Sequence, residues 1–107
     1  MKDYEVSVLG TTYSVKYQTP EENSKLNGND GLAELYSKEI ILNPIVADAD
    51  SFNNLYEYAN KTVRHELIHA FLFESGLWKY SKDEVLVDML AIQMPKMVKA
   101  MQEAGCL

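Results

Sequence analysis

The first third of the chain alternates hydrophobic and polar residues with the period of a β-strand. Hydrophobic side chains recur at every second position over residues 4–8 and 13–17, and Gly10-Thr11 between these runs suits a tight hairpin turn. Strand character returns over residues 31–43, where a polar break at Ser37-Lys38 divides two apolar runs. These patterns predict two antiparallel hairpins separated by a loop rich in turn-forming residues.

Beyond Pro44 the hydrophobic period changes to that of an α-helix. Asp50 or Ser51 can cap a helix, and residues 52–75 contain no glycine or proline. Gly76 then supplies the left-handed residue that commonly ends a helix. Because apolar side chains lie nearly all round the second half of this segment, we expect that half to be buried.

A second helix is expected after a short connection over residues 76–80. Ser81 and Glu84 have the spacing of a capping box, which predicts that this helix begins at Ser81. Pro95 is expected to break or kink it and to leave a short amphipathic tail. With no internal repeat or linker, the pattern predicts a single α+β domain over residues 1–107, in which an antiparallel sheet packs on the long first helix.

Length and charge narrow the classes of function. The 107 residues fit one small domain, and 47% hydrophobic with 24% charged residues is typical of a globular chain. The formal charge of -6 disfavours a nucleic-acid partner, because phosphate backbones are bound by basic surfaces. The lone cysteine, Cys106, cannot form an internal disulfide, and no run approaches the roughly 18 apolar residues of a membrane span. We therefore expect a cytoplasmic protein without a membrane partner.

Both histidines of the chain lie in the run RHELIH, residues 64–69. Residues four apart on a helix point the same way, so His65 and His69 can bind one metal ion. Glu66 can then reach a water on that ion without being a ligand, which is the HExxH arrangement of zinc hydrolases. Ordinary core histidines are the simpler interpretation, but a charged glutamate in an apolar helix is costly without a partner. We expect a Zn²⁺ site with Glu66 as the catalytic base and acid.

A zinc site that keeps one position open for water needs a third protein ligand. No third histidine exists, and Cys106 lies at the terminus, which leaves carboxylates. Glu84 and Asp88 share a face of the second helix; we expect Glu84 to bind the metal and Asp88 to accept a hydrogen bond from a ligand histidine. Two alternatives stay open: Asp88 is the ligand, or Glu84 only caps the helix.

The segments RHELIHAFLFESGL and KDEVLVDMLAIQMPK resemble small HExxH proteins of bacteriophages and prophages, relatives of the ImmA/IrrE-type metallopeptidases among the gluzincin-like zincins. The resemblance covers about residues 31–96. In that family a glutamate early in the second helix, matched by Glu84, is the third ligand, and related gluzincins have an acid at the position of Asp88. A recurring Met-Pro pair is matched by Met94-Pro95. The resemblance also implies a zincin-like fold with a sheet beside the active-site helix.

These observations predict a zinc-dependent peptidase with one ion per chain, which the resemblance implies acts on a protein or peptide substrate in a bacterial host cell. The alternative is a non-catalytic binding module in which a structural or degenerate metal site holds the fold. We expect a strand over residues 39–43 to align an extended substrate at the sheet edge. The hydroxyl of Tyr36 or Tyr80, or the indole N–H of Trp78, is a candidate donor to the oxyanion, although a structural role is the simpler interpretation of each of these aromatic residues.

Overall fold

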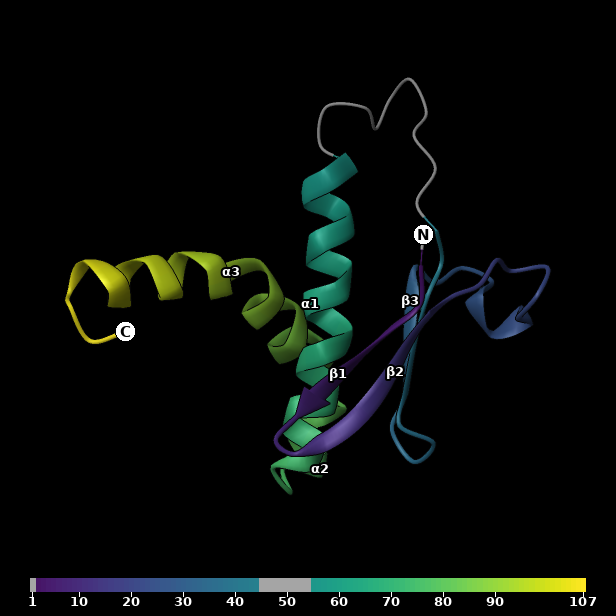
Figure 1. The fold of residues 1–107 in the computed structure, drawn as a ribbon, viewed down its shortest axis with the longest axis horizontal. Helices are drawn as coiled ribbons and strands as arrows, with labels where there is room; N and C mark the ends of the chain where they lie inside the picture. Colours follow the sequence, from purple (N-terminus) through teal and green to yellow (C-terminus); the bar gives the residue numbers. More distant parts are fainter. Residues whose placement is uncertain (1, 45–54) are drawn as a thin grey trace.

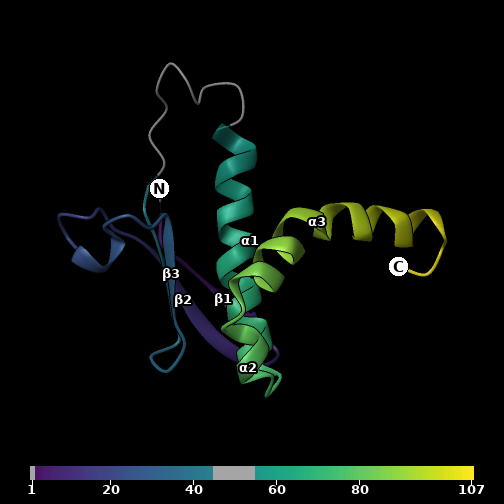
Figure 2. The ribbon, with the colours of Figure 1, turned by 180° about the vertical axis from the view of Figure 1, so that it is seen from behind.

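The computed structural model describes residues 2–44 and 55–107, which form a four-stranded sheet and two long helices (Figure 1). The elements are β1 (Tyr4–Val8), β2 (Thr11–Tyr17), the 3-10 helix η1 (Ser24–Leu26), β3 (Gly31–Glu34), β4 (Glu39–Leu42), α1 (Leu55–Glu74), α2 (Trp78–Ser81) and α3 (Glu84–Glu103). Strands precede helices, so the chain has the expected α+β class. The α1 helix lies against the sheet, and α3 crosses α1 and extends away from the strands (Figures 1 and 2). The expected cap at Asp50 or Ser51 lies outside the described residues.

The first predicted hairpin is confirmed, but its turn lies one residue earlier than expected. The register of β1 and β2 pairs Val8 with Thr11, which leaves Leu9 and Gly10 as the turn. Both have a positive φ, 50° for Leu9 and 87° for Gly10. Two positive φ values define a type I′ turn, whose twist suits a hairpin. The predicted Gly10-Thr11 turn is therefore wrong, because Thr11 already belongs to β2 and pairs with Val8 of β1.

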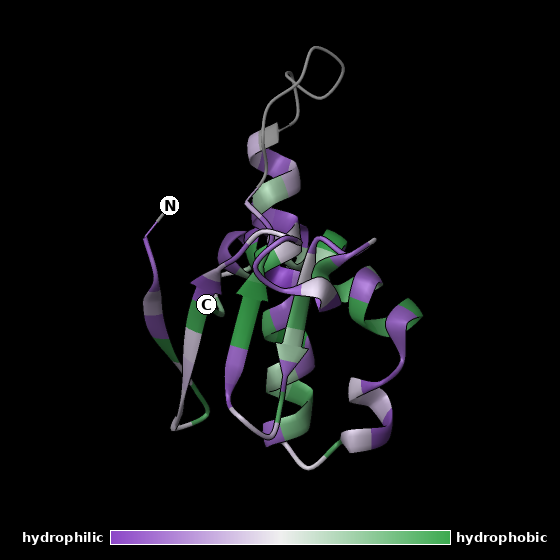
Figure 3. Cartoon of the chain, turned by 90° about the vertical axis from the view of Figure 1, so that its right-hand side faces the viewer, coloured by the Kyte–Doolittle hydropathy of each residue, from purple (hydrophilic) through white to green (hydrophobic). Residues whose placement is uncertain are grey.

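The second predicted hairpin, formed by β3 and β4, is also confirmed, but the complete sheet is not antiparallel. The two hairpins join through β2 and β4, which run parallel and give the strand order β1-β2-β4-β3. Since β4 is internal, the expectation that residues 39–43 offer an edge to a substrate is wrong. Its hydrophobic colour over most of its length in Figure 3 agrees with this position. The two strands at the ends of the sheet are β1 and β3, and β3 lies next to β4.

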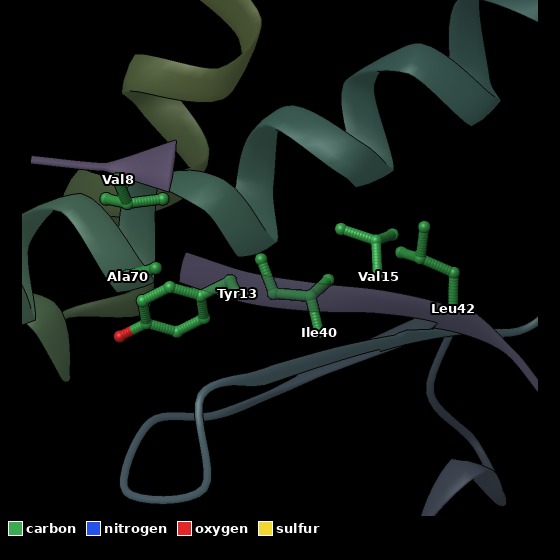
Figure 4. Close-up of a cluster of buried hydrophobic side chains, with 6 residues drawn as sticks. All are labelled: Val8, Tyr13, Val15, Ile40, Leu42 and Ala70. Carbon is green, nitrogen blue, oxygen red and sulfur yellow. The ribbon is translucent and has the colours of Figure 1, made fainter. Parts of the chain in front are cut away.

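Two apolar clusters pack on different sides of α1. The cluster between the sheet and α1 contains Val8, Tyr13, Val15, Ile40, Leu42 and Ala70 (Figure 4). The cluster between α1 and α3 contains Ile68, Leu72, Val87 and Ala91. Residues two apart on a helix point in nearly opposite directions, so Ile68 and Ala70 face different clusters. This accounts for the apolar character of α1 on most sides, although Phe71 is 49% exposed.

The first long helix ends at Gly76, as predicted. Gly76 has a φ of 80°. Its N–H donates to the carbonyl of Phe73 at 3.0 Å, and the N–H of Leu77 donates to the carbonyl of Leu72 at 2.9 Å. This pair of bonds is a Schellman motif, in which a left-handed residue allows the last carbonyls to be satisfied. The short helix α2 follows, where we expected a plain connection.

The predicted capping box at the second long helix is wrong. Asp83 caps α3 instead, with its carboxylate accepting a hydrogen bond from the Leu86 N–H at 3.1 Å. Ser81 is buried at the end of α2, so it cannot serve as the cap. Glu84 is the first residue of α3, which leaves its carboxylate free of a capping role. The α3 helix continues well past Pro95, so the proline does not break it, and the helix is bent partway along (Figures 1 and 2).

Glu74, at the end of α1, ties the helix to the sheet. Its carboxylate accepts hydrogen bonds from Lys38 Nζ at 2.6 Å, Tyr13 Oη at 2.6 Å and Thr11 Oγ1 at 3.0 Å. The bond from Lys38, followed by that from Tyr13, lowers the pKa of Glu74 from 4.5 to about 2. Between these pH values the unfolded chain binds a proton that the folded chain does not. The stabilisation that ionised Glu74 gives to the folded state is therefore complete above pH 4.5, and it is lost as the pH falls toward 2.

Replacing Glu74 with Gln is expected to lower the midpoint of thermal unfolding by several degrees near neutral pH, because a neutral amide binds the Lys38 ammonium less strongly. The difference from the wild type should shrink as the pH falls from 4.5 toward 2. Circular dichroism melts over this pH range measure both effects, with the exposed Glu21→Gln as the matched control. A difference that stays constant with pH would contradict the role given to Glu74.

Candidate metal centre

Three of the predicted site residues lie close together on α1. The rings of His65 and His69 have centroids 4.9 Å apart and are inclined by 68°. Glu66 is almost completely buried, with 7% of its surface exposed. Because α1 is packed by the sheet on one side and by α3 on the other, this stretch of backbone is fixed by both apolar clusters.

The start of α3 brings Glu84 to both imidazoles. Glu84 Oε2 lies 3.0 Å from His65 Nε2, and Glu84 Oε1 lies 3.0 Å from His69 Nε2. One ligand atom from each of the three residues can be chosen so that all lie within 4.8 Å of one another. Tetrahedral zinc with ligands at 2.0–2.1 Å holds them about 3.3 Å apart, and the two distances from Glu84 to the imidazoles are close to this value, so the three residues could hold one metal ion of this kind.

The second nitrogen of each imidazole faces an oxygen acceptor. His65 Nδ1 lies 3.1 Å from Asp88 Oδ1, and His69 Nδ1 lies 2.5 Å from the backbone carbonyl of Ser81. A neutral ring that donates from Nδ1 has a lone pair on Nε2. Both lone pairs then face the oxygens of Glu84, which are acceptors as well. A bound cation removes this conflict between acceptors.

Asp88 lies at the Nδ1 edge of His65, where it was expected to accept a hydrogen bond. Its Oδ1 is also 2.6 Å from Lys61 Nζ. The hydrogen bond from Lys61, and then that from His65, lowers the pKa of Asp88. Since Asp88 contacts Nδ1 and Glu84 contacts Nε2, the two acids occupy opposite edges of the imidazole. Within the described residues, the group that could hold a metal contains Glu84 and not Asp88.

The contact of Ser81 with His69 was not predicted from the sequence, which indicated Ser81 only as a helix cap. Only 2% of its surface is exposed, and it makes two hydrogen bonds with His69. Its carbonyl accepts from the ring Nδ1, and its hydroxyl donates to the His69 carbonyl at 2.8 Å. These bonds fix α2 against α1. The four residues of α2 are too few to show a helical period, so the sequence carries no signal for this contact.

A pocket of about 600 Å³ opens over these groups. One wall is α1, the other is β3 with the residues before it, and Ser81 and Glu84 line it as well. Gly31, in the wall formed by β3, leaves room for the Glu66 side chain of the opposite wall. A Cβ at residue 31 would lie 3.1 Å from Glu66 Cγ and 3.2 Å from Glu66 Oε2. The Tyr58 hydroxyl donates to the Asp30 carboxylate and so links the two walls.

Burial gives Glu66 an unusual protonation equilibrium. Its pKa is raised to about 7, first by burial, with Glu84 adding to the increase while His65 and Lys61 oppose it. A metal cation beside the imidazoles would lower the pKa again. A carboxyl group poised in this range can both accept and return a proton near neutral pH.

The three aromatic candidates for an oxyanion donor do not line the pocket, which agrees with the simpler structural interpretation of each. Tyr36 packs edge-on against Phe73, and Trp78 stacks on the same ring. Tyr80 is 49% exposed. Side-chain donors that do line the pocket include Tyr58 and Lys61 of α1, neither of which the sequence singled out.

Comparison of the chain with known protein families, curated proteins and solved structures found no match. The resemblance to phage HExxH proteins therefore rests on the sequence segments quoted above. No helix in residues 2–44 and 55–107 has the length and apolar character needed to cross a membrane.

Proposed function

We propose that the protein is a zinc-dependent metallopeptidase in which His65, His69 and Glu84 bind the ion. One observation carries the proposal: the two Nε2 atoms each lie 3.0 Å from an oxygen of Glu84, while both Nδ1 atoms are committed to other acceptors. The residue types suit zinc, because two imidazoles and one carboxylate leave a fourth position open for water. The adjoining pocket and the buried Glu66 support a catalytic site rather than a closed structural one.

Glu66 supplies the proton transfers in this proposal. Bound zinc would lower the pKa of a coordinated water to about 7 and polarise the substrate carbonyl. Glu66, next to His65 on α1, accepts a proton as the water attacks a peptide carbonyl, and it then returns a proton to the leaving amine. Asp88 and the Ser81 carbonyl keep the two imidazoles in the required orientation.

The substrate is proposed to bind along β3 in place of the internal strand expected at first. β3 is the last strand of the described sheet and forms a wall of the pocket. An extended peptide can add to such an edge through backbone hydrogen bonds. Because Gly31 of β3 lies against Glu66, a peptide held there would bring a carbonyl close to the proposed base. The resemblance to ImmA/IrrE-type proteins supports a protein substrate in a bacterial host.

Metal binding by two acidic variants tests the proposed ligand set. Wild-type protein should bind one zinc ion per chain, and Glu84→Ala should lose it at concentrations that saturate the wild type, because one of three protein ligands is gone. Asp88→Ala should keep the stoichiometry and bind roughly 10- to 100-fold more weakly, as expected when only the orientation of a ligand is lost. Isothermal titration and metal analysis of dialysed protein measure both. The exposed Glu103→Ala, on the same helix, is the control. Full zinc content in Glu84→Ala would refute the assignment.

A further inference from the structure

A hydrogen bond from Arg64 to the carbonyl of Ala91 joins α1 to α3 beside the proposed metal site. The Nε–H of Arg64 donates to this oxygen at 2.7 Å, and Ala91 is completely buried. In a regular helix the carbonyl of residue 91 accepts the N–H of residue 95. Residue 95 is proline, which has no N–H. Pro95 therefore frees the same acceptor that Arg64 uses.

The bond joins the two helices that carry the proposed ligands. Arg64 directly precedes His65, and Ala91 follows Glu84 by two helical turns, on the same side of α3. Arg64 is the only arginine of the chain. A hydrogen bond from a charged donor such as its guanidinium is stronger than one from a neutral donor. Together with the contacts of His65 to Glu84 and Asp88, it fixes α3 against α1 at several points along the crossing.

We propose that Arg64 and Pro95 together set the position of α3, and we call this pair the clamp. The proposal rests on the zinc site proposed above. Arg64 is a positioning residue: its bond to Ala91 holds the start of α3 where Glu84 reaches both imidazoles. Pro95 acts by withdrawing one backbone donor inside a continuous helix, which makes a buried carbonyl available to the neighbouring helix. The clamp thus couples a backbone feature of α3 to the geometry of the metal ligands.

The test separates positioning from simple satisfaction of a buried carbonyl. Arg64→Leu leaves that carbonyl without a donor, so we expect a lower unfolding temperature and a zinc affinity reduced about 10-fold or more. Adding Pro95→Ala to Arg64→Leu restores a backbone N–H for the carbonyl. The double variant should regain thermal stability but keep the weakened zinc affinity, because the bond between the helices is still absent. The conservative Arg64→Lys should retain most of the affinity, since its ammonium can also donate.

Zinc titration, thermal melts and the visible absorption spectrum of the cobalt(II)-substituted protein measure these outcomes. An altered cobalt spectrum in both leucine variants supports the clamp, because that spectrum reports ligand geometry directly. Wild-type affinity in Arg64→Leu, or recovery of affinity together with stability in the double variant, overturns it. A wild-type chain that binds no zinc overturns the proposed function and the clamp with it, whereas zinc binding unaffected by the Arg64 variants overturns the clamp alone.

Discussion

Replacing Glu66 with Gln should abolish peptide hydrolysis while one zinc ion per chain stays bound. Glutamine has nearly the same shape but cannot accept a proton, and loss of a general base and acid costs roughly 10²- to 10⁴-fold in rate. Glu66 does not belong to the group of residues that could hold the ion, so the metal should remain. The buried site should also accept the neutral amide without unfolding, because burial already disfavours the ionised carboxylate.

The measurement compares the proteomes of bacterial cells that express wild-type or Glu66→Gln protein, with new chain termini identified by mass spectrometry. The exposed Glu57→Gln, on the same helix, should cleave like the wild type and serves as the control. Zinc content and melting curves of each purified variant show that site and fold persist. If both proteins bind zinc and no cleavage product depends on Glu66, the chain is better described as a non-catalytic binding module whose metal holds the fold.

Removing zinc should lower the midpoint of thermal unfolding by roughly 15 °C or more. An ion that binds only the folded chain, present at about 1,000 times its dissociation constant, stabilises that chain by about 4 kcal/mol. The ion would bridge α1 and α3 through His65, His69 and Glu84. Without it the imidazole lone pairs face the oxygens of Glu84, and that contact no longer favours the native crossing of the helices.

Calorimetry of the protein in excess zinc and in excess chelator measures this shift. Glu84→Ala provides the control, because a variant that has lost a ligand should melt at nearly the same temperature in both conditions. A wild-type midpoint that does not respond to zinc would argue against a metal bridging the two helices. It would leave the direct approach of Glu84 to the two imidazoles as the native contact.

Features fixed by local geometry could be predicted from the sequence. The approach of His65 to His69 follows from their spacing and the helical repeat of 3.6 residues, and both lie on α1. The end of α1 followed from Gly76, because a left-handed residue at that point suits a glycine. The first hairpin followed from alternation along two short segments, and the second from two apolar runs divided by a polar break. In each case the determining contacts lie within a few residues of one another.

Features that depend on contacts between distant segments could not be predicted in this way. The parallel pairing of β2 with β4 joins two hairpins across a long loop, and local alternation does not specify which strands meet. Leu26 is fully buried although it lies in a segment rich in turn formers. The approach of Glu84 to the imidazoles depends on α2, which no periodicity revealed. The cap of α3 was predicted at Ser81 but lies at Asp83, because Ser81 is engaged in a tertiary contact with His69.

The two walls of the pocket come from different parts of the chain. Every group that faces the proposed ion or orients its ligands lies between Lys61 and Pro95, within the helices. The opposite wall comes from residues 28–33 and Leu35, which belong to β3 and to the two segments that flank it. Gly31 must stay, because a side chain there would press on Glu66. Substitutions at the other positions of this wall would alter which peptides enter without touching the metal ligands or the proposed base. Selectivity and chemistry can then change independently, and a library confined to these positions would be an economical route to new substrates.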